Sequence, residues 1–165
     1  LETMPQIVWA TFPDGAHDYY NSRWYEFTGL PGDSDGHAWS DLLHPEDRDQ
    51  AAAAWRHALA TGEPYAIEYR LRHHSGAYRW VLGRALPVRD AEGRIERWYG
   101  TCTDIDEQKT AQEALRLETR EAIKARAVLK AEKERLQKLF QEAPGFICVF
   151  SGPEHVFDFV NETFR

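Results

Sequence analysis

Residues 65–72 alternate between large apolar side chains and polar or small ones, which is the pattern of a β-strand with one buried face. Ser75-Gly76 then turns the chain into a second strand-like stretch at residues 78–88. A further turn leads into a third stretch at residues 94–104. Three consecutive strands joined by short turns predict an antiparallel meander.

Two short apolar runs near the start of the chain, residues 7–11 and 16–20, flank a Pro-Asp-Gly turn and predict a hairpin. Asn21 or Ser22 is placed to cap a short helix that Gly29 closes.

A longer helix is predicted from about Pro45 to Ala60, because proline suits the first helical position and acidic residues follow it. The predicted order is therefore two strands, short helices, one longer helix and three strands. An antiparallel sheet with its helices gathered on one face is the simplest arrangement of these elements, and it is an α+β fold.

Residues 105–140 have a different composition, rich in Ala, Leu, Glu, Lys, Arg and Gln, with no glycine or proline. They predict one helix of about 54 Å, longer than the side of a domain. An apolar residue recurs every seven positions in this stretch, at Leu115, Ala122, Leu129 and Leu136. Leu139 occupies a flanking apolar position. We expect a parallel coiled coil with a seam weakened by Glu118 and Glu132; the alternative is a solvated helix lying on its own domain.

The chain also contains an internal repeat. Residues 4–10 resemble residues 143–149 at an offset of 139, and a turn and a second apolar run follow both. Asn21 then matches Asn161 at an offset of 140. We therefore expect the end of the chain to be the truncated start of a second, related module.

Composition excludes several classes of function. The net charge is −7, of which −6 lies in residues 1–104, so binding to nucleic acid or to an anionic membrane is not expected. No apolar run is long enough to span a membrane, and Cys102 and Cys148 lack the spacing of metal ligands or a redox pair, so we expect a cytoplasmic protein. The sequence contains no phosphate-binding loop and no nucleophile motif that would indicate an enzyme.

The ordered series of motifs resembles a PAS domain, of the class common in bacterial sensor kinases. The matching stretches are residues 7–9, 14–15, 20–21, 24–29, 43–48, 68–72, 76–80 and 98–106. The resemblance implies a PAS fold, with a five-stranded antiparallel sheet in the order 2-1-5-4-3 and helices enclosing a small pocket on one face. It also implies a PAS sensor domain at residues 1–106, a signalling helix at 107–140 and the start of a second PAS domain at 141–165.

Aromatic residues are candidates to line that pocket and stack on a flat ligand; the alternative is that they only fill the core. The candidates are Trp9, Trp24, Trp39, Trp55, Tyr69 and Trp80. The motif that ends the domain, Asp104-Ile105-Asp106, has aspartate where the family usually has threonine. We expect it to transmit the signal, with Asp104 contacting an arginine such as Arg70 or Arg79.

The resemblance leaves the cofactor unknown. His57 lies on the helix that supplies the iron ligand in haem-binding members, but its neighbours do not reproduce their motif, so haem is not expected. The reactive-cysteine motif of light-sensing members is absent, which excludes a cysteinyl-flavin photocycle but leaves non-covalent flavin open. We expect His44 to serve in a helix start, His73-His74 to be solvated at a turn, and no metal site.

These observations predict a sensory and regulatory PAS module of a multidomain bacterial signalling protein, a histidine kinase of a two-component system. The segment would sense a small molecule and form a homodimer through the linker helix and the PAS domain. Two alternatives remain: a ligand-free PAS module for dimerisation or protein interaction, and the sensor of a protein that turns over cyclic nucleotides.

Overall fold

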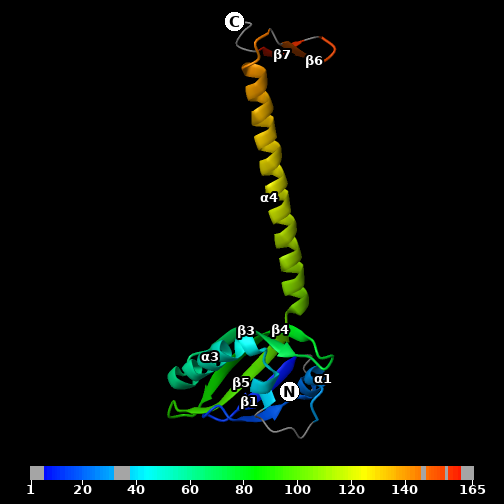
Figure 1. The fold of residues 1–165 in the computed structure, drawn as a ribbon. Helices are drawn as coiled ribbons and strands as arrows, with labels where there is room; N and C mark the ends of the chain where they lie inside the picture. The colour runs from blue at the N-terminus through cyan, green and yellow to red at the C-terminus, as the bar shows by residue number, and fades with distance from the viewer. Residues whose placement is uncertain (1–5, 32–37, 146–147, 155, 161–165) are drawn as a thin grey trace. The chain divides into compact units, whose positions relative to one another are not determined.

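The structure is a computed structural model that describes residues 6–31, 38–145, 148–154 and 156–160 (Figure 1). The chain divides into two compact units, Leu1–Ala111 and Gln112–Arg165. Each unit is described by itself below.

The first unit is built on a five-stranded antiparallel sheet with the strand order β2-β1-β5-β4-β3. Its strands are β1 (Ile7–Thr11), β2 (His17–Tyr20), β3 (Tyr65–Arg72), β4 (Tyr78–Arg89) and β5 (Ile95–Asp104). The predicted fold class and strand order are therefore confirmed. The first and last strands pair in the middle of the sheet, so β5 ends next to the start of β1.

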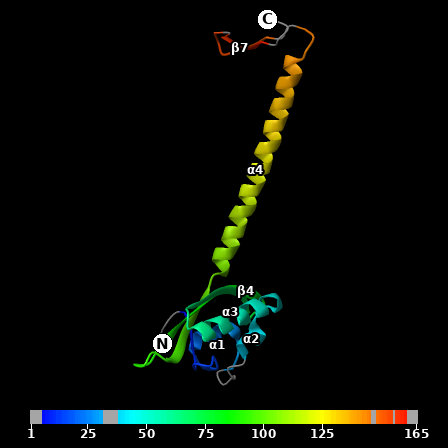
Figure 2. The same ribbon diagram turned by 90° about the vertical axis from the view of Figure 1, so that its left-hand side faces the viewer.

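The helices of this unit gather on one face of the sheet (Figure 2). They are α1 (Ser22–Thr28), α2 (Ala38–Leu42), the 3₁₀ turn η1 (Pro45–Asp47) and α3 (Arg48–Thr61). The longer helix thus begins at the predicted proline, but its first turn is a 3₁₀ helix. Gly29 and Gly62 end α1 and α3 with φ angles of 73° and 71°, a conformation that favours glycine.

The core lies between this helical face and the sheet. Tyr65, Tyr69 and Leu71 of β3 are buried, whereas Ala66 and Glu68 are exposed, so the period-two pattern places the predicted residues inside. We call the helical side of the sheet the inner face and the opposite side the outer face.

Asn21 occupies the position before α1, but its side chain does not cap that helix. Its Oδ1 accepts a hydrogen bond from the Val8 N–H at 3.0 Å, and its Nδ2 donates to the Gln6 carbonyl at 2.9 Å. The asparagine is fully buried and joins the start of α1 to β1. The cap prediction was wrong, because the side chain pairs with the buried Val8 N–H of β1 and with the Gln6 carbonyl just before that strand.

The helix α4 (Asp106–Gln141) begins in the first unit and continues into the second. A two-stranded hairpin follows, β6 (Cys148–Ser151) with β7 (Val156–Val160). Cys148 pairs with Val160 and a bulge follows Val149; these positions match the Trp9–Tyr20 pair and the bulge after Ala10 in the first hairpin. The two hairpins therefore share one register, while Asn161 lies outside the described residues.

Candidate functional site

Four of the predicted aromatic residues meet inside the first unit. Trp9, Trp39, Trp55 and Tyr69 line a small cavity together with His17 and Tyr65. The cavity has a volume of about 10 Å³, which is space for about one water molecule. It therefore has no room for a haem or a flavin.

Trp55, which α3 holds over the inner face, is the centre of this cluster. Its ring meets three other rings edge to face, with centroid distances of 5.6 Å to Trp9, 5.1 Å to Tyr65 and 5.3 Å to Trp98. Edge-to-face contacts of this kind stabilise aromatic cores beyond the burial of area. The arrangement therefore favours core packing around a small residual space.

The Tyr69 hydroxyl joins this cluster to the last strand. It accepts a hydrogen bond from Trp39 Nε1 at 3.3 Å and lies 3.3 Å from Cys102 Sγ in β5. Burial raises the pKa of both groups, that of Cys102 to about 11, so both are neutral at pH 7. A buried neutral thiol is a poor nucleophile. The Tyr65 hydroxyl is also buried and has no hydrogen-bond partner among the described residues.

The structure does not bring the other two candidates to the cavity. Trp24 is buried elsewhere in the core, where it stacks on Tyr20 at a centroid distance of 4.4 Å. Trp80 pairs with Arg70 across the strands, on the outer face. The sequence marked Tyr65 as an inward position but gave no signal for His17, which reaches the cavity only through the pairing of β1 with β2.

The first turn of α4 is fixed to the sheet by a network of polar contacts. Asp104 Oδ2 lies 3.0 Å from Arg79 Nη1, and Asp104 Oδ1 accepts the N–H of Asp106 at 3.0 Å. Asp106 Oδ1 in turn accepts the Trp80 N–H at 3.0 Å, and the Trp80 carbonyl accepts the N–H of Ile105 at 2.9 Å. We call Arg79, Asp104, Ile105 and Asp106 the joint. The aspartate at the third motif position thus bonds directly to β4.

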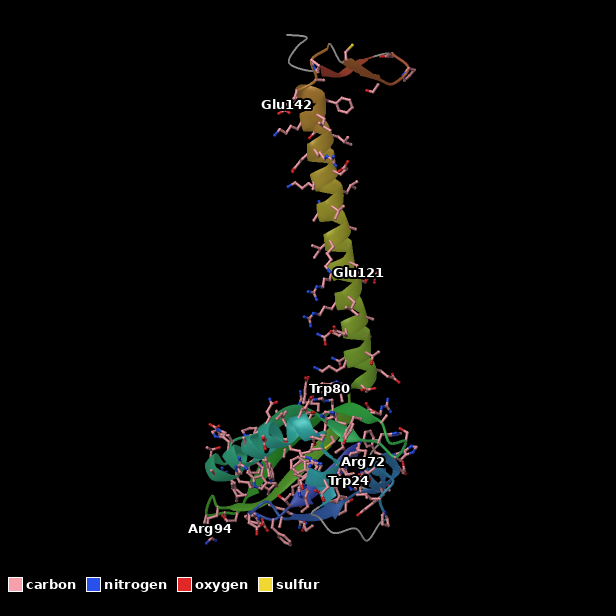
Figure 3. All side chains as sticks on the ribbon, in the orientation of Figure 1. Trp24, Arg72, Trp80, Arg94, Glu121 and Glu142 are labelled. Atoms are coloured by element: carbon pink, nitrogen blue, oxygen red, sulfur yellow. The ribbon has the colours of Figure 1, made fainter. Side chains whose placement is uncertain are left out.

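A second set of contacts holds α4 from the outer face. Lys109 forms an ion pair with Glu68, and its Nζ lies 5.3 Å from the centre of the Trp80 ring. The Arg70 guanidinium lies at the same distance from that ring. Figure 3 shows Trp80 at the base of α4. Trp80 is therefore a support for the base of the helix, through cation–π contacts, and not a lining residue of the cavity.

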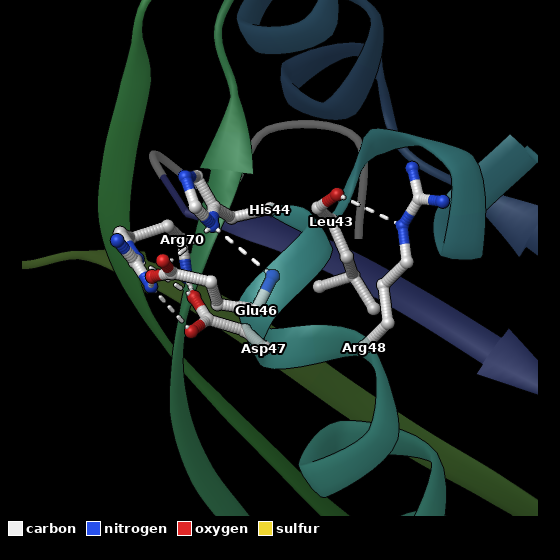
Figure 4. A network of polar contacts seen from close by, with 6 residues as sticks. All are labelled: Leu43, His44, Glu46, Asp47, Arg48 and Arg70. Atoms are coloured by element: carbon white, nitrogen blue, oxygen red, sulfur yellow. Dashed lines mark hydrogen bonds and ion pairs between the residues drawn. The ribbon is translucent and has the colours of Figure 1, made fainter.

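Arg70 does not contact Asp104, because Asp47 and Glu46 bind it instead (Figure 4). Asp47 Oδ2 accepts hydrogen bonds from the Arg70 backbone N–H at 2.8 Å and from Nε at 2.9 Å, and Oδ1 accepts one from Nη2 at 2.7 Å. These hydrogen bonds lower the pKa of Asp47 and raise that of Arg70. The start of α3 is thereby tied to β3 and, through Arg70, to Trp80.

The histidines have local roles. His44 Nδ1 accepts the Glu46 N–H at 3.3 Å at the start of η1, as expected. His57 is exposed and lies 3.1 Å from Glu63, so it does not face the cavity. His73 Nδ1 is 3.0 Å from the Ser75 hydroxyl, and the ring is half-buried against Phe27.

A search of the described ranges for groups of three or more potential metal ligands finds none. In the same ranges, no helix combines the length and apolarity required to cross a lipid bilayer.

Two curated proteins match large parts of this chain. An uncharacterised protein of Sinorhizobium fredii, y4lL, is 37% identical over 115 residues, which cover 70% of this chain and 14% of the relative. The two-component sensor PprA of Pseudomonas aeruginosa is 26% identical over 170 residues, which cover 99% of this chain and 16% of the sensor. The chain therefore spans only a small part of each relative.

Solved structures extend the match to the fold. A sensory box histidine kinase/response regulator of Burkholderia thailandensis superposes with a TM-score of 0.55 at 27% identity, covering 72% of this chain and 90% of that structure. The model of the family described as the PAS fold matches residues 17–102, more than half of the chain. The chain belongs to the PAS family.

Proposed function

We propose that this chain is the sensory module of a larger bacterial signalling protein, with a sensor histidine kinase as the parent. It detects a small molecule at the aromatic cavity and transmits the change through α4. The similarity to sensor proteins such as PprA supports the parent class. The joint supports the transmission, because it connects the last strand and β4 directly to the first turn of the helix.

The route from the cavity to the joint is short. Cys102, which contacts the Tyr69 hydroxyl, lies two residues before Asp104 on β5. A ligand that hydrogen-bonds to the unpartnered Tyr65 hydroxyl would have to enlarge the cavity and displace Tyr69 or Trp39. Displacement of Tyr69 would change its contact with Cys102 of β5, and we expect the resulting shift of β5 to reach the Asp104–Arg79 contact. A switch needs two arrangements that differ by only a few kcal/mol, and partly exposed ion pairs at the joint fit that requirement.

The second unit supplies the output. Leu115, Leu129, Leu136 and Leu139 are all exposed on α4 in the single chain. A parallel partner helix would bury this row and give a homodimer whose two PAS units change together. The shared hairpin register supports the start of a second PAS domain after the helix.

The transmission is tested in the parent protein by comparing autophosphorylation rates of Asp104→Ala, Arg79→Ala and the double variant. We expect both single variants to change the basal rate several-fold in the same direction, and the double variant to change it by less than the two single effects combined, because both single variants break the Asp104–Arg79 contact. Arg94→Ala removes the exposed ion pairs of Arg94 with Asp90 and Glu92 and is the control. Wild-type rates and unchanged regulation in the Asp104 and Arg79 variants would refute the transmission.

One observation favours the ligand-free alternative, in which the module only dimerises: the cavity of about 10 Å³ holds no ligand larger than water without rearrangement. Native mass spectrometry and an absorption spectrum of the freshly purified chain separate the two functions. Extra mass or absorbance above 300 nm, on the order of one ligand per chain, supports sensing. A dimer with the mass of the polypeptide alone supports the alternative.

A further inference from the structure

A pocket of about 540 Å³ lies at the end of the sheet where β5 finishes. Its lining residues come from α1, from the paired ends of β1 and β5, and from the turn between β3 and β4. Among the described residues, none lines both this pocket and the aromatic cavity. Cavities of roughly 300 to 1,000 Å³ are typical of small-molecule sites, so the size suits a small ligand. We call it the α1 pocket.

The deep part of the α1 pocket is apolar. Ile7 of β1 and Cys102 of β5 are cross-strand partners that line the pocket, and both are buried. Phe27 of α1 also lines it, and its ring packs edge to face against His73 with a centroid distance of 4.9 Å. An apolar group of a ligand would be removed from water here, which favours binding.

Two opposite charges lie at the exposed edge of the pocket. Arg23 and Glu26 are three residues apart on α1, which places them on the same side of the helix. Arg23 Nη1 lies 2.6 Å from Glu26 Oε2, and both side chains are about half exposed. The pair does not use the remaining N–H groups of the guanidinium or Glu26 Oε1, so both residues can also bind a ligand.

His73 adds an uncharged hydrogen-bond donor to the lining. Its Nδ1 accepts the N–H of Ser75 at 3.3 Å, so the neutral ring carries its proton on Nε2. Burial lowers the pKa of His73, and the nearby His74 and Arg79 lower it further, against an opposing effect of Asp104. The ring is therefore neutral at pH 7, and its Nε2–H can donate to an anionic group.

This arrangement favours a ligand that carries two opposite charges over a ligand that carries one. Both charged groups of an α-amino acid are attached to the same carbon, so they lie nearly as close together as the Arg23 and Glu26 groups do. Such a ligand, oriented with its charges reversed, contacts both residues while their own ion pair remains. A carboxylate alone would compete with Glu26 for Arg23, and an amine alone would compete with Arg23 for Glu26. The net charge of −6 in residues 1–104 also opposes an anion.

We propose that the α1 pocket binds a free α-amino acid with an apolar side chain. The ligand carboxylate accepts hydrogen bonds from Arg23 and from His73 Nε2, its ammonium group donates to Glu26, and its side chain occupies the apolar deep part. This site is separate from the aromatic cavity and does not depend on the proposed function. Because Asp104 lines the pocket and also belongs to the joint, the bound ligand lies beside the joint.

Isothermal titration calorimetry of the 165-residue chain with L-leucine at pH 7 tests the proposal. Two analogues of leucine each lack one of its charges: 4-methylpentanoate has no amine, and 3-methylbutylamine has no carboxylate. The pocket variants are Arg23→Gln and Glu26→Gln. The matched control is Arg94→Gln, which removes exposed ion pairs of Arg94 outside the pocket. Circular dichroism verifies that each variant is folded.

We expect L-leucine to bind the wild-type chain with a dissociation constant below about 1 mM. Each analogue should bind wild type at least about tenfold more weakly than leucine does, because it loses the hydrogen bonds of one charged group. Leucine should bind each pocket variant at least about tenfold more weakly for the same reason. The control should bind leucine within about twofold of the wild-type affinity, because its site is intact.

Three outcomes would overturn the proposal. A dissociation constant above about 1 mM for leucine and the wild-type chain excludes the site. Equal affinities for leucine and for either analogue show that the pocket does not use both charges. Loss of leucine binding in Tyr65→Phe, with wild-type binding in Arg23→Gln and Glu26→Gln, places the ligand in the aromatic cavity instead.

Discussion

Replacing Asp47 tests how strongly the start of α3 is tied to the sheet. Asp47→Ala removes a carboxylate that accepts three hydrogen bonds from Arg70, one from its backbone and two from its guanidinium. Hydrogen bonds to charged groups contribute about 1.5 to 3 kcal/mol each, and they do not add. Asp47 is 14% exposed and Arg70 25%, so water restores part of the loss. We expect a decrease of about 3 kcal/mol in the free energy of unfolding.

The control is Glu46→Ala. Glu46 makes a single contact with Arg70, and its side chain is 74% exposed, so this change should cost less than about 1 kcal/mol. Urea unfolding followed by tryptophan fluorescence measures the difference, and all six tryptophans lie in the first unit. The signal therefore reports this unit alone. A decrease in the free energy of unfolding below about 0.5 kcal/mol for Asp47→Ala would refute the claim that its hydrogen bonds with Arg70 hold the start of α3 on the sheet.

The same pair predicts a pH dependence. The Arg70 hydrogen bonds lower the pKa of Asp47 in the folded chain, so the unfolded chain binds a proton at this position more readily. The stabilisation is fully present above the unfolded pKa of about 4 and is lost as the pH falls through the lower folded value. Asp47→Asn should therefore be less stable than wild type at pH 7, and the difference in the free energy of unfolding between the two proteins should decrease below pH 4. A stability difference that stays constant down to pH 3 would contradict the link between the Asp47 pKa and the stability of the fold.

Two further predictions concern the interior. Cys102 is 2% exposed and its burial raises its pKa to about 11, whereas Cys148 is exposed. A thiol reagent at pH 8 should therefore modify only Cys148 in the native chain and both cysteines in urea. Rapid modification of both cysteines in the native chain would contradict the burial of Cys102. Gly100→Ala should destabilise the first unit by about 3 kcal/mol in the same urea assay, because the added Cβ would lie 2.2 Å from the Trp9 ring. A stability within about 0.5 kcal/mol of wild type would show that Trp9 moves aside.

The sequence predicted the strands well, because an alternating pattern identifies a half-buried strand wherever it lies. The predicted stretches at residues 78–88 and 94–104 correspond to Tyr78–Arg89 and Ile95–Asp104. The predicted helix at residues 105–140 corresponds to Asp106–Gln141. The strand order came from the family resemblance and not from the pattern, since alternation does not say which strands become neighbours.

The roles of single side chains were harder to predict. Trp80 and Tyr69 are both aromatic residues in adjacent strands, yet Tyr69 lines the cavity and Trp80 supports α4 from the outer face. The alternating pattern distinguishes the two residues. Val81 is buried on the inner face, and Trp80, as its neighbour in β4, faces the opposite side of the sheet. Asn21 had a strong local capping signal, but its side chain bonds to β1 instead.

By itself, the sequence determined the elements of this chain, the internal repeat and the amphipathic helix, because each depends on spacing along one stretch of chain. Tertiary structure alone decided which arginine meets Asp104, which aromatic residues enclose the cavity and how little space they leave. Arg70 and Arg79 both suited the joint by charge; the pairing of β3 with β4 and the position of Asp47 assigned Arg70 elsewhere. Such choices depend on contacts between distant segments, and no local pattern records them.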